Sequence, residues 1–264
     1  MDGRKIYRFT VQWGEARDTD DAEGEVIATS DVRPDRAAIE AVLPQFVGAI
    51  EQVPPAFSAI KIDGVRAYDL AREKQPVELA ARTIQIDRLE IDDLPDPDHA
   101  VFLVECGKGS YMRSLARDIA VALGTVGHVT ALRRIAVGPF HEDQAHALAK
   151  LEDVGHIDQD SLELLPVETA LADIPALAVS GSEAAGLRQG RPVALFRRSD
   201  LDRVSGFEDG DVLRAACDGI TVALVRFEEG QAKPMRVIHR PKRLADAQAE
   251  AIPPLEGTDD VDHA

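Results

Sequence analysis

Residues 106–114 read Cys-Gly-Lys-Gly-Ser-Tyr-Met-Arg-Ser, and this stretch decides how the middle of the chain folds. The apolar run 101–104 comes just before it and has the composition of a buried strand. Gly107 and Gly109 bracket a lysine, which is how a strand ends in a tight turn. Ser110 is placed to cap the helix that follows. The stretch therefore predicts a strand, a turn and a helix in succession.

The predicted helix continues with apolar residues at helical spacing and ends at Gly124. Tyr111 and Arg113 then lie in its first turn, where backbone N–H groups are free to meet an anion. A planar ring and a guanidinium at that point could hold a flipped nucleobase and its phosphate. The motif alone is equally compatible with a strand–turn–helix that carries a surface arginine.

Strand and helix patterns alternate along the rest of the chain without regular βαβ units. This order favours an α+β fold with a mixed, mainly antiparallel sheet flanked by helices. The acidic segment 15–24 is expected to be a loop. Strands are predicted over residues 5–13, 25–28, 58–62, 83–94, 101–106 and 126–137, and helices near residues 34–43, 65–74 and 111–123.

The composition changes twice towards the C-terminus. Residues 155–161 are polar, and short apolar runs separated by Gly and Asp follow them. We therefore expect a first domain over 1–155, a linker over 156–171 and a small β-rich domain over 172–240. Residues 241–264 are rich in Ala, Asp, Glu and Pro, a composition typical of disorder.

The charge of −17 argues against general nucleic-acid binding, because phosphate contacts need Lys and Arg. Residues 104–138 nevertheless carry a net charge of +3, which suits a locally basic cleft or an ordinary solvated surface. Cys106 and Cys217 are far apart and indicate reduced thiols in a cytoplasmic protein. His141 and His146 have no further ligand cluster, so no metal site is predicted. No apolar run is long enough to predict a membrane span.

Six stretches stand out in order along the chain: residues 5–8 (KIYR), 18–24 (DTDDAEG), 54–61 (PPAFSAIK), 64–72 (GVRAYDLAR), 107–113 (GKGSYMR) and 128–134 (HVTALRR). In this order they resemble the bacterial tRNA pseudouridine-55 synthases, the TruB family. The resemblance is close over residues 4–140 and weaker to about residue 240.

The resemblance implies an isomerase that converts a uridine in the tRNA T-loop, position 55, to pseudouridine. It implies no cofactor, no metal, a cytoplasmic location, the T-arm of tRNA as partner, and a monomer for the complete enzyme. In the family, a small PUA-like domain follows the catalytic domain and helps to hold RNA, which suits the predicted β-rich domain.

The resemblance also implies roles for individual residues. Tyr7 and Tyr111 would contact the target nucleotide, Leu132 would lie against the uracil ring, and Arg113 would pair with the catalytic aspartate. From pattern alone, Tyr7 is more often a packed strand residue and Leu132 a core residue. Four residues carry less weight. These are Asp21, which lies near the site in the family, and Lys61, Arg133 and Arg134, which could contact phosphates.

The family's nucleophilic aspartate lies in a segment of the form Gly-His-x-Gly-Thr-Leu-Asp-Pro, and the 264 residues contain no such string. We therefore expect an inactive chain in which Arg113 lacks its carboxylate partner. A gene start placed at an internal methionine is the favoured explanation. A non-catalytic RNA-binding or RNA-folding protein is the alternative. Residues 5–13 are the strand expected to be exposed at a sheet edge, with self-association as the consequence.

Overall fold

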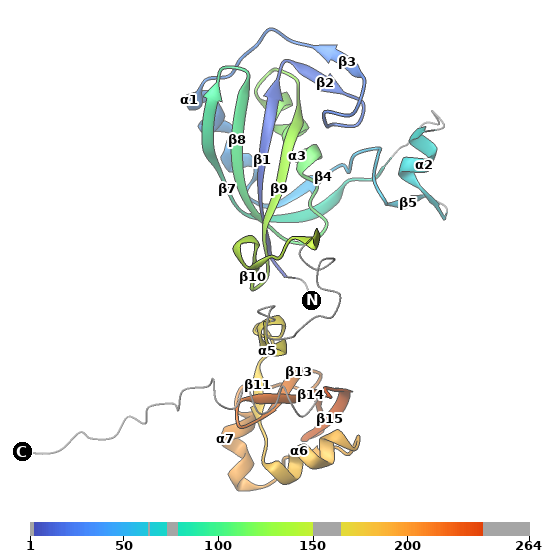
Figure 1. The fold of residues 1–264 in the computed structure, drawn as a ribbon, viewed down its shortest axis with the longest axis vertical. Helices are drawn as coiled ribbons and strands as arrows, with labels where there is room; N and C mark the ends of the chain where they lie inside the picture. The colour runs from blue at the N-terminus through green and yellow to red at the C-terminus, as the bar shows by residue number, and fades with distance from the viewer. Residues whose placement is uncertain (1–2, 63, 73–78, 150–164, 240–264) are drawn as a thin grey trace, which may run out of the picture. The chain divides into compact units, whose positions relative to one another are not determined.

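The computed structural model describes residues 3–62, 64–72, 79–149 and 165–239, and Figure 1 shows their ribbon. The chain divides into two compact units, residues 1–162 and residues 163–264. None of the helices in the described residues is long and apolar enough to cross a membrane.

Unit 1 is built on a six-stranded sheet in which every neighbouring pair is antiparallel. The order across the sheet is β10 (Phe140–His141), β9 (Gly127–Val137), β1 (Lys5–Trp13), β8 (His99–Cys106), β7 (Arg82–Asp96) and β4 (Gly48–Gln52). β7 and β8 form the expected hairpin, with Asp96 opposite His99.

Two short ribbons and several helices complete unit 1 (Figure 1). The expected loop 15–24 contains a short strand, because residues 15–17 pair with residues 26–29. The ribbons are β2 (Glu15–Arg17) with β3 (Val26–Thr29), and β5 (Lys61–Ile62) with β6 (Val65–Arg66). The helices are α1 (Arg36–Val42), η1 (Leu43–Phe46), α2 (Ala67–Arg72), α3 (Met112–Ala122) and η2 (Glu142–Gln144).

Alternation along β1 puts Phe9, Val11 and Trp13 on one face of the sheet, and all three are fully buried. Leu115 and Ile119 of α3 are equally buried in the same core cluster. Burying each such side chain contributes about 1.5–3 kcal/mol, so this face holds the helix against the sheet. The core thus fixes where α3 begins relative to β1 and β9.

β1 is not an edge strand, which corrects the expectation for residues 5–13. It pairs with β8 along one side and with β9 along the other. Its apolar residues are therefore covered by neighbouring strands and by α3, and the strand has no unpaired edge to which another chain could add.

The start of α3 also differs from the sequence expectation. Tyr111, not Ser110, is the N-cap residue, and no side chain caps the helix there. The Ser110 hydroxyl instead donates to the carbonyl of Gly107 at 3.3 Å. The far end is as expected, since Gly124 follows the helix with a φ of +70°, a conformation that favours glycine.

Unit 2 contains a five-stranded sheet with its own core, in which Leu177, Leu187, Leu213 and Val225 are fully buried. Most of its strand pairs are antiparallel, and β11 pairs with β13 in parallel. The order is β11 (Ala176–Ala178), β13 (Val212–Cys217), β14 (Ile220–Glu228), β15 (Gln231–Val237) and β12 (Val193–Ala194). Its helices are α5 (Val167–Ala170), α6 (Gly181–Arg188), η3 (Arg198–Asp200) and α7 (Leu201–Val204).

The expected α+β architecture with mainly antiparallel sheets is therefore confirmed. Part of the expected linker contains α5, and residues 156–164 and the expected tail at 241–264 lie outside the described residues. The domain limits stay predictions.

Candidate active site

Arg113 is the centre of the site, because it ties the start of α3 to two loops that are distant in sequence. Its Nη1 donates to the carbonyl of Thr19 and to Oδ2 of Asp21, both at 3.0 Å. Its Nη2 donates to the carbonyl of Phe57 at 2.7 Å. The side chain is 24% exposed, so the guanidinium is partly buried and still reached by solvent.

Asp21 pairs with Arg113, so Arg113 is not the cation without a carboxylate partner that was expected from the sequence; the nucleophilic aspartate of the family motif is a different residue. Its other oxygen, Oδ1, accepts a hydrogen bond from the Thr19 hydroxyl at 2.7 Å and one from the backbone of Glu23 at 3.1 Å. Asp21 also forms a parallel bridge with Val129 of β9. The acidic loop is therefore an ordered part of the site, attached both to the sheet and to α3.

Arg117 repeats the pattern of Arg113 one helical turn later. It binds Oδ2 of Asp20 at 2.9 Å and the carbonyl of Val53 at 2.9 Å, and its Nε reaches Asp118 at 3.0 Å. Residues four apart lie on the same face of a helix. Arg113 and Arg117 thus hold the segments 18–21 and 53–58 against one face of α3.

Asp20 lies where an ionised carboxylate is electrostatically unfavourable. Burial raises the pKa of its carboxyl, and the Arg117 ion pair offsets only part of this effect. Its φ of +59° is also unusual for a residue with a side chain. Burial raises the pKa of Asp118 as well, again opposed by Arg117.

Tyr111 is fixed by Gln52, a residue that is 2% exposed at the end of β4. The Gln52 side chain accepts from the Tyr111 N–H at 2.8 Å and donates to the Tyr111 carbonyl at 3.1 Å. Both backbone polar groups of the residue that begins α3 are therefore satisfied by one amide. This leaves the half-buried tyrosine ring in a defined place without a side-chain cap.

Tyr7 and Leu132 belong to paired strands on the helix-covered face of the sheet. Leu132 lies opposite Phe9, and Tyr7 lies opposite Arg134. Directly opposed residues point to the same face, so Tyr7, Leu132 and Arg134 share the face on which α3 packs. Leu132 is 51% exposed and is thus not the core residue that strand pattern alone suggests. Tyr7 is half-buried and packs against the core.

Arg133 and Lys61, which were also predicted to contact phosphates, lie away from this face of the sheet. Arg133 pairs with Arg8 on the other face and binds Glu142 at 2.5 Å. Lys61 lies in the separate β5–β6 ribbon. No described contact joins either side chain to Arg113 or Tyr111.

Sequence reasoning missed the residues that hold the site together. It assigned no role to Gln52, Arg117 or Asp20. The only available signal for Arg117 was its spacing of four from Arg113 on a predicted helix. Gln52 had no signal, because its partner is 59 residues away.

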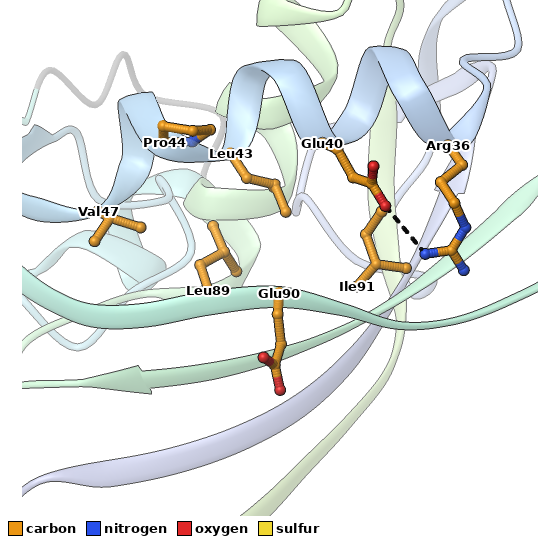
Figure 2. Close-up of a pocket in the computed structure, with 8 residues that line it drawn as sticks. All are labelled: Arg36, Glu40, Leu43, Pro44, Val47, Leu89, Glu90 and Ile91. Carbon is orange, nitrogen blue, oxygen red and sulfur yellow. Dashed lines mark hydrogen bonds and ion pairs between the residues drawn. The ribbon is translucent and has the colours of Figure 1, made fainter.

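A separate groove of about 590 Å³ lies where α1 and η1 pass over β7 (Figure 2). Figure 2 shows Leu43 and Leu89 facing each other across it, with the Arg36–Glu40 ion pair at one end. None of the predicted site residues lines it. The groove therefore belongs to the packing of α1 and not to the site at the start of α3.

Comparisons with known proteins agree with the resemblance carried by the motifs. The profile "TruB family pseudouridylate synthase (N terminal domain)" matches residues 1–112, and "tRNA pseudouridylate synthase B C-terminal domain" matches residues 113–172. A tRNA pseudouridine synthase B of Rhodospirillum rubrum is 52% identical over 239 residues, covering 90% of this chain and 78% of that protein. One of Bradyrhizobium diazoefficiens is 53% identical over 244 residues, covering 90% of this chain and 69% of that protein.

Solved structures are similar in fold at lower identity. The chain matches a protein of a Cbf5-Nop10-Gar1 complex with a TM-score of 0.60 and 22% identity, covering 90% of this chain and 66% of that one. It also matches a chain of an H/ACA RNP bound to a substrate RNA with a TM-score of 0.61 and 19% identity, covering 90% of this chain and 67% of that one. The motifs, the fold and the relatives at about half identity together show that the chain belongs to the TruB family of pseudouridylate synthases.

Proposed function

We propose that this TruB-family protein acts in the cytoplasm on the T-arm of tRNA, where it isomerises the uridine at position 55 to pseudouridine. Family membership and the names of its relatives support the reaction class and the RNA substrate. The acid-free segments 107–117 and 119–141, which contain α3 and β9, support an RNA-facing site on an acidic protein.

The reaction detaches uracil from its N-glycosidic bond, turns the ring and rejoins it to the ribose through carbon. Substrate and product have the same atoms and oxidation state, so the chemistry requires positioning of a flipped base and a group that attacks the nucleotide. In the proposal, the rings of Tyr7 and Tyr111 and the side chain of Leu132 hold the extruded base.

The observation that carries the proposal is the hydrogen bonding of Arg113. Its guanidinium has five N–H donors, of which three bind Thr19, Asp21 and Phe57. Nε–H and the second hydrogen of Nη2 have no acceptor among the described residues. Uncommitted N–H groups of a guanidinium can donate charge-assisted hydrogen bonds to a carboxylate. Arg113 is thus pre-positioned by Asp21 and still able to orient a second carboxylate.

The 264 residues contain no Gly-Thr-Leu-Asp string, and the proposal assigns the nucleophile to none of the carboxylates present. Asp21 is occupied by Arg113, Thr19 and the backbone of Glu23, which suits a positioning role. For these 264 residues tested alone, we expect tritium release from tRNA labelled at C5 of uridine to be slower by several orders of magnitude than for a tRNA pseudouridine synthase B.

Binding tests the site independently of turnover. We expect a T-arm hairpin to bind at least tenfold more tightly than an anticodon-arm hairpin, measured by fluorescence anisotropy. The variant Tyr111→Ala should lose about tenfold in affinity for the T-arm hairpin, because a base-stacking ring contributes about 1–3 kcal/mol. Arg88→Ala, which removes an exposed arginine paired with Glu90, is the control. Equal affinities for both hairpins would contradict the proposal.

A non-catalytic RNA-binding or RNA-folding protein of the same family is the second candidate. It predicts the same hairpin affinities but no pseudouridine in any assay. Tritium release that depends on Arg113 and on the T-arm uridine would decide against it.

A further inference from the structure

An exposed phenylalanine, Phe140, lies in β10 at the edge of the sheet in unit 1 (Figure 1). Its side chain is 41% exposed, although phenylalanine is among the residues most often buried. Phe140 lies directly opposite Val137, and Val137 lies opposite Lys5. Directly opposed residues point to the same face of a sheet, so Phe140 lies on the face that carries Tyr7.

The turn before Phe140 is fixed in place. Gly138 in this turn has a φ of +52°, a conformation that favours glycine. Its N–H donates to the carbonyl of Arg4 at 2.7 Å, which attaches the hairpin of β9 and β10 to the residue before β1. The backbone that carries the Phe140 ring is therefore held both by β9 and by the segment that leads into β1.

The solvent-accessible part of this face runs along β9 and ends at Phe140. Leu132 and Arg134 are both exposed. Leu132 and Val137 are five positions apart in a strand with one bulge, which places them roughly 15 Å apart at about 3.3 Å per residue. This length exceeds that of one nucleobase. A base held by Tyr7 and Leu132 therefore leaves the Phe140 end of the strip for a neighbouring nucleotide.

The charged residues in the rows next to Phe140 are both cations, Lys5 and Arg134. The Lys5 ammonium donates to a neutral group, the carbonyl of Gly3, at 2.9 Å. The Arg134 guanidinium has no acceptor among the described residues. Three rows of directly paired residues cross the sheet here on the face of Phe140: Cys106, Lys5, Val137 and Phe140; Val104, Tyr7 and Arg134; and Phe102, Phe9 and Leu132.

The acidic residues of the same strands lie on the opposite face of the sheet. Glu105 is paired with Ile6, which alternates with Lys5 and Tyr7 along β1. Arg8, also on that face, binds Asp92 at 2.6 Å. An anionic ligand therefore meets two cations without an acidic neighbour in their rows on the face of Phe140, and mixed charges on the other face.

From these observations we propose that Phe140, with Lys5 and Arg134, forms a subsite for a nucleotide next to the target uridine. The base of this nucleotide stacks on the Phe140 ring, and the two cations hold its phosphate. An aromatic ring beside cations binds unpaired RNA, because every base has a face on which a ring can stack. The class of ligand and the place of the target base rest on the proposed function. Phe140 binds the substrate and takes no part in the chemistry.

The test measures the affinity of the full 264-residue chain for fluorescein-labelled T-arm hairpins by anisotropy. One hairpin is intact, and two others carry an abasic site at the nucleotide before or after the target uridine. Phe140→Ala should weaken binding of the intact hairpin about tenfold, and Phe140→Trp should keep it within about twofold. Thermal melting checks that each variant is folded.

The abasic hairpins show whether a neighbouring base is the partner of the ring. For the wild-type chain, one of the two abasic sites should lower the affinity about tenfold. Phe140→Ala should bind that abasic hairpin as well as it binds the intact one, because the contact is already lost. Losses that simply multiply at both positions would overturn the inference. Unchanged affinity of Phe140→Ala for the intact hairpin would overturn it as well.

Salt dependence tests the cations separately from the ring. Arg134→Ala should lower the slope of log Kd against log salt by about 0.7, the value for one phosphate contact, and Arg134→Lys should restore it. The controls are Arg88→Ala, which removes an exposed arginine of the opposite face, and Ile27→Ala, which removes an exposed apolar side chain of β3. Neither control should change the affinity or the slope. An equal drop in slope for Arg88→Ala and Arg134→Ala would overturn the assignment of the phosphate to this face.

The inference and the proposed function fail separately. If Tyr111→Ala weakens binding of the T-arm hairpin while Phe140→Ala changes nothing, the inference is wrong and the proposed function stands. If T-arm and anticodon-arm hairpins bind equally while Phe140 and a neighbouring base remain coupled, the proposed function fails and the subsite stands. No measurable binding of the hairpin by the wild-type chain would overturn both.

Discussion

Gln52 decides the position of Tyr111 although it cannot touch a substrate. It is buried, and its amide is the partner of both backbone polar groups of Tyr111. An apolar replacement would leave the Tyr111 N–H without its partner, while the Tyr111 carbonyl keeps the N–H of Leu115 at 3.0 Å. An unsatisfied buried polar group costs about 1–3 kcal/mol.

We expect Gln52→Leu to lower the free energy of unfolding by about 1–3 kcal/mol in urea titrations. It should also weaken T-arm hairpin binding, because the Tyr111 ring is no longer held. The control is Gln85→Leu, an exposed glutamine whose amide reaches Asp87 at 3.3 Å, and it should change neither quantity by much. Equal stabilities for the two variants would show that the amide does not hold the helix start.

Asp20 gives a pH dependence whose sign follows from its raised pKa. A carboxyl with a folded-state pKa above its usual 3.8 is more costly to ionise in the folded chain than in the unfolded one. The Asp20 carboxyl therefore contributes to stability while it is protonated at low pH. This contribution is lost as the pH rises from about the usual pKa of the carboxyl through its raised folded-state pKa. The Asp20→Asn variant has no carboxyl to ionise, so it avoids this loss of stability at neutral pH. In the variant, Arg117 keeps Asp118 and the Val53 carbonyl as partners.

We expect Asp20→Asn to melt at the same or a slightly higher temperature than wild type at pH 7. The advantage of the variant should shrink as the pH falls towards 4. Thermal melts at a series of pH values measure the difference. A variant that is clearly less stable at pH 7, with the gap closing on acidification, would mean that the ion pair outweighs the burial cost.

At the scale of elements, α3 anchors two loops through two arginines that lie one helical turn apart. Arg113 binds Thr19, Asp21 and Phe57, and Arg117 binds Asp20 and Val53. Ser114 between them adds a hydrogen bond to the Val53 carbonyl at 2.8 Å. Loops that are attached mainly through a few side-chain contacts open more readily than the strands of the sheet.

We expect Arg117→Ala to speed amide hydrogen exchange in residues 18–25 and 53–60 while leaving β1 and β8 protected. The reason is that the variant removes one of several attachments of each loop without touching the core. Hydrogen exchange read by mass spectrometry measures it, with Arg88→Ala as the matched arginine control. A uniform rise across the sheet would show instead that Arg117 supports the whole fold.

How much the sequence predicts depends on the range of the interaction. The helix over residues 111–123 and the hairpin over 83–106 were predictable, because apolar periodicity and turn residues are local signals. The central position of β1 was not, because it is set by pairing with β8 and β9, both more than 80 residues away. The Asp21–Arg113 pair spans 92 residues, and only family resemblance placed both near one site.

At the scale of the whole molecule, charge is separated along the sequence. Several segments without acidic residues, among them 107–117 and 119–141, interrupt a chain with 47 acidic and 30 basic residues. These two contain α3 and β9, which contribute to the site in unit 1. An acidic protein surface repels RNA, whereas a local basic surface attracts it. This combination favours selective binding over general binding.

The central claim is that the target uridine enters unit 1 between the start of α3 and the β1–β9 pair. Photocrosslinking tests it most directly, with 4-thiouridine at the target position of a T-arm hairpin and adducts located by mass spectrometry. The same nucleotide in an anticodon-arm hairpin is the control. We predict adducts on peptides that contain Tyr7, Tyr111 or Leu132, absent with the control hairpin. Adducts confined to unit 2, or identical patterns from both hairpins, would contradict the claim.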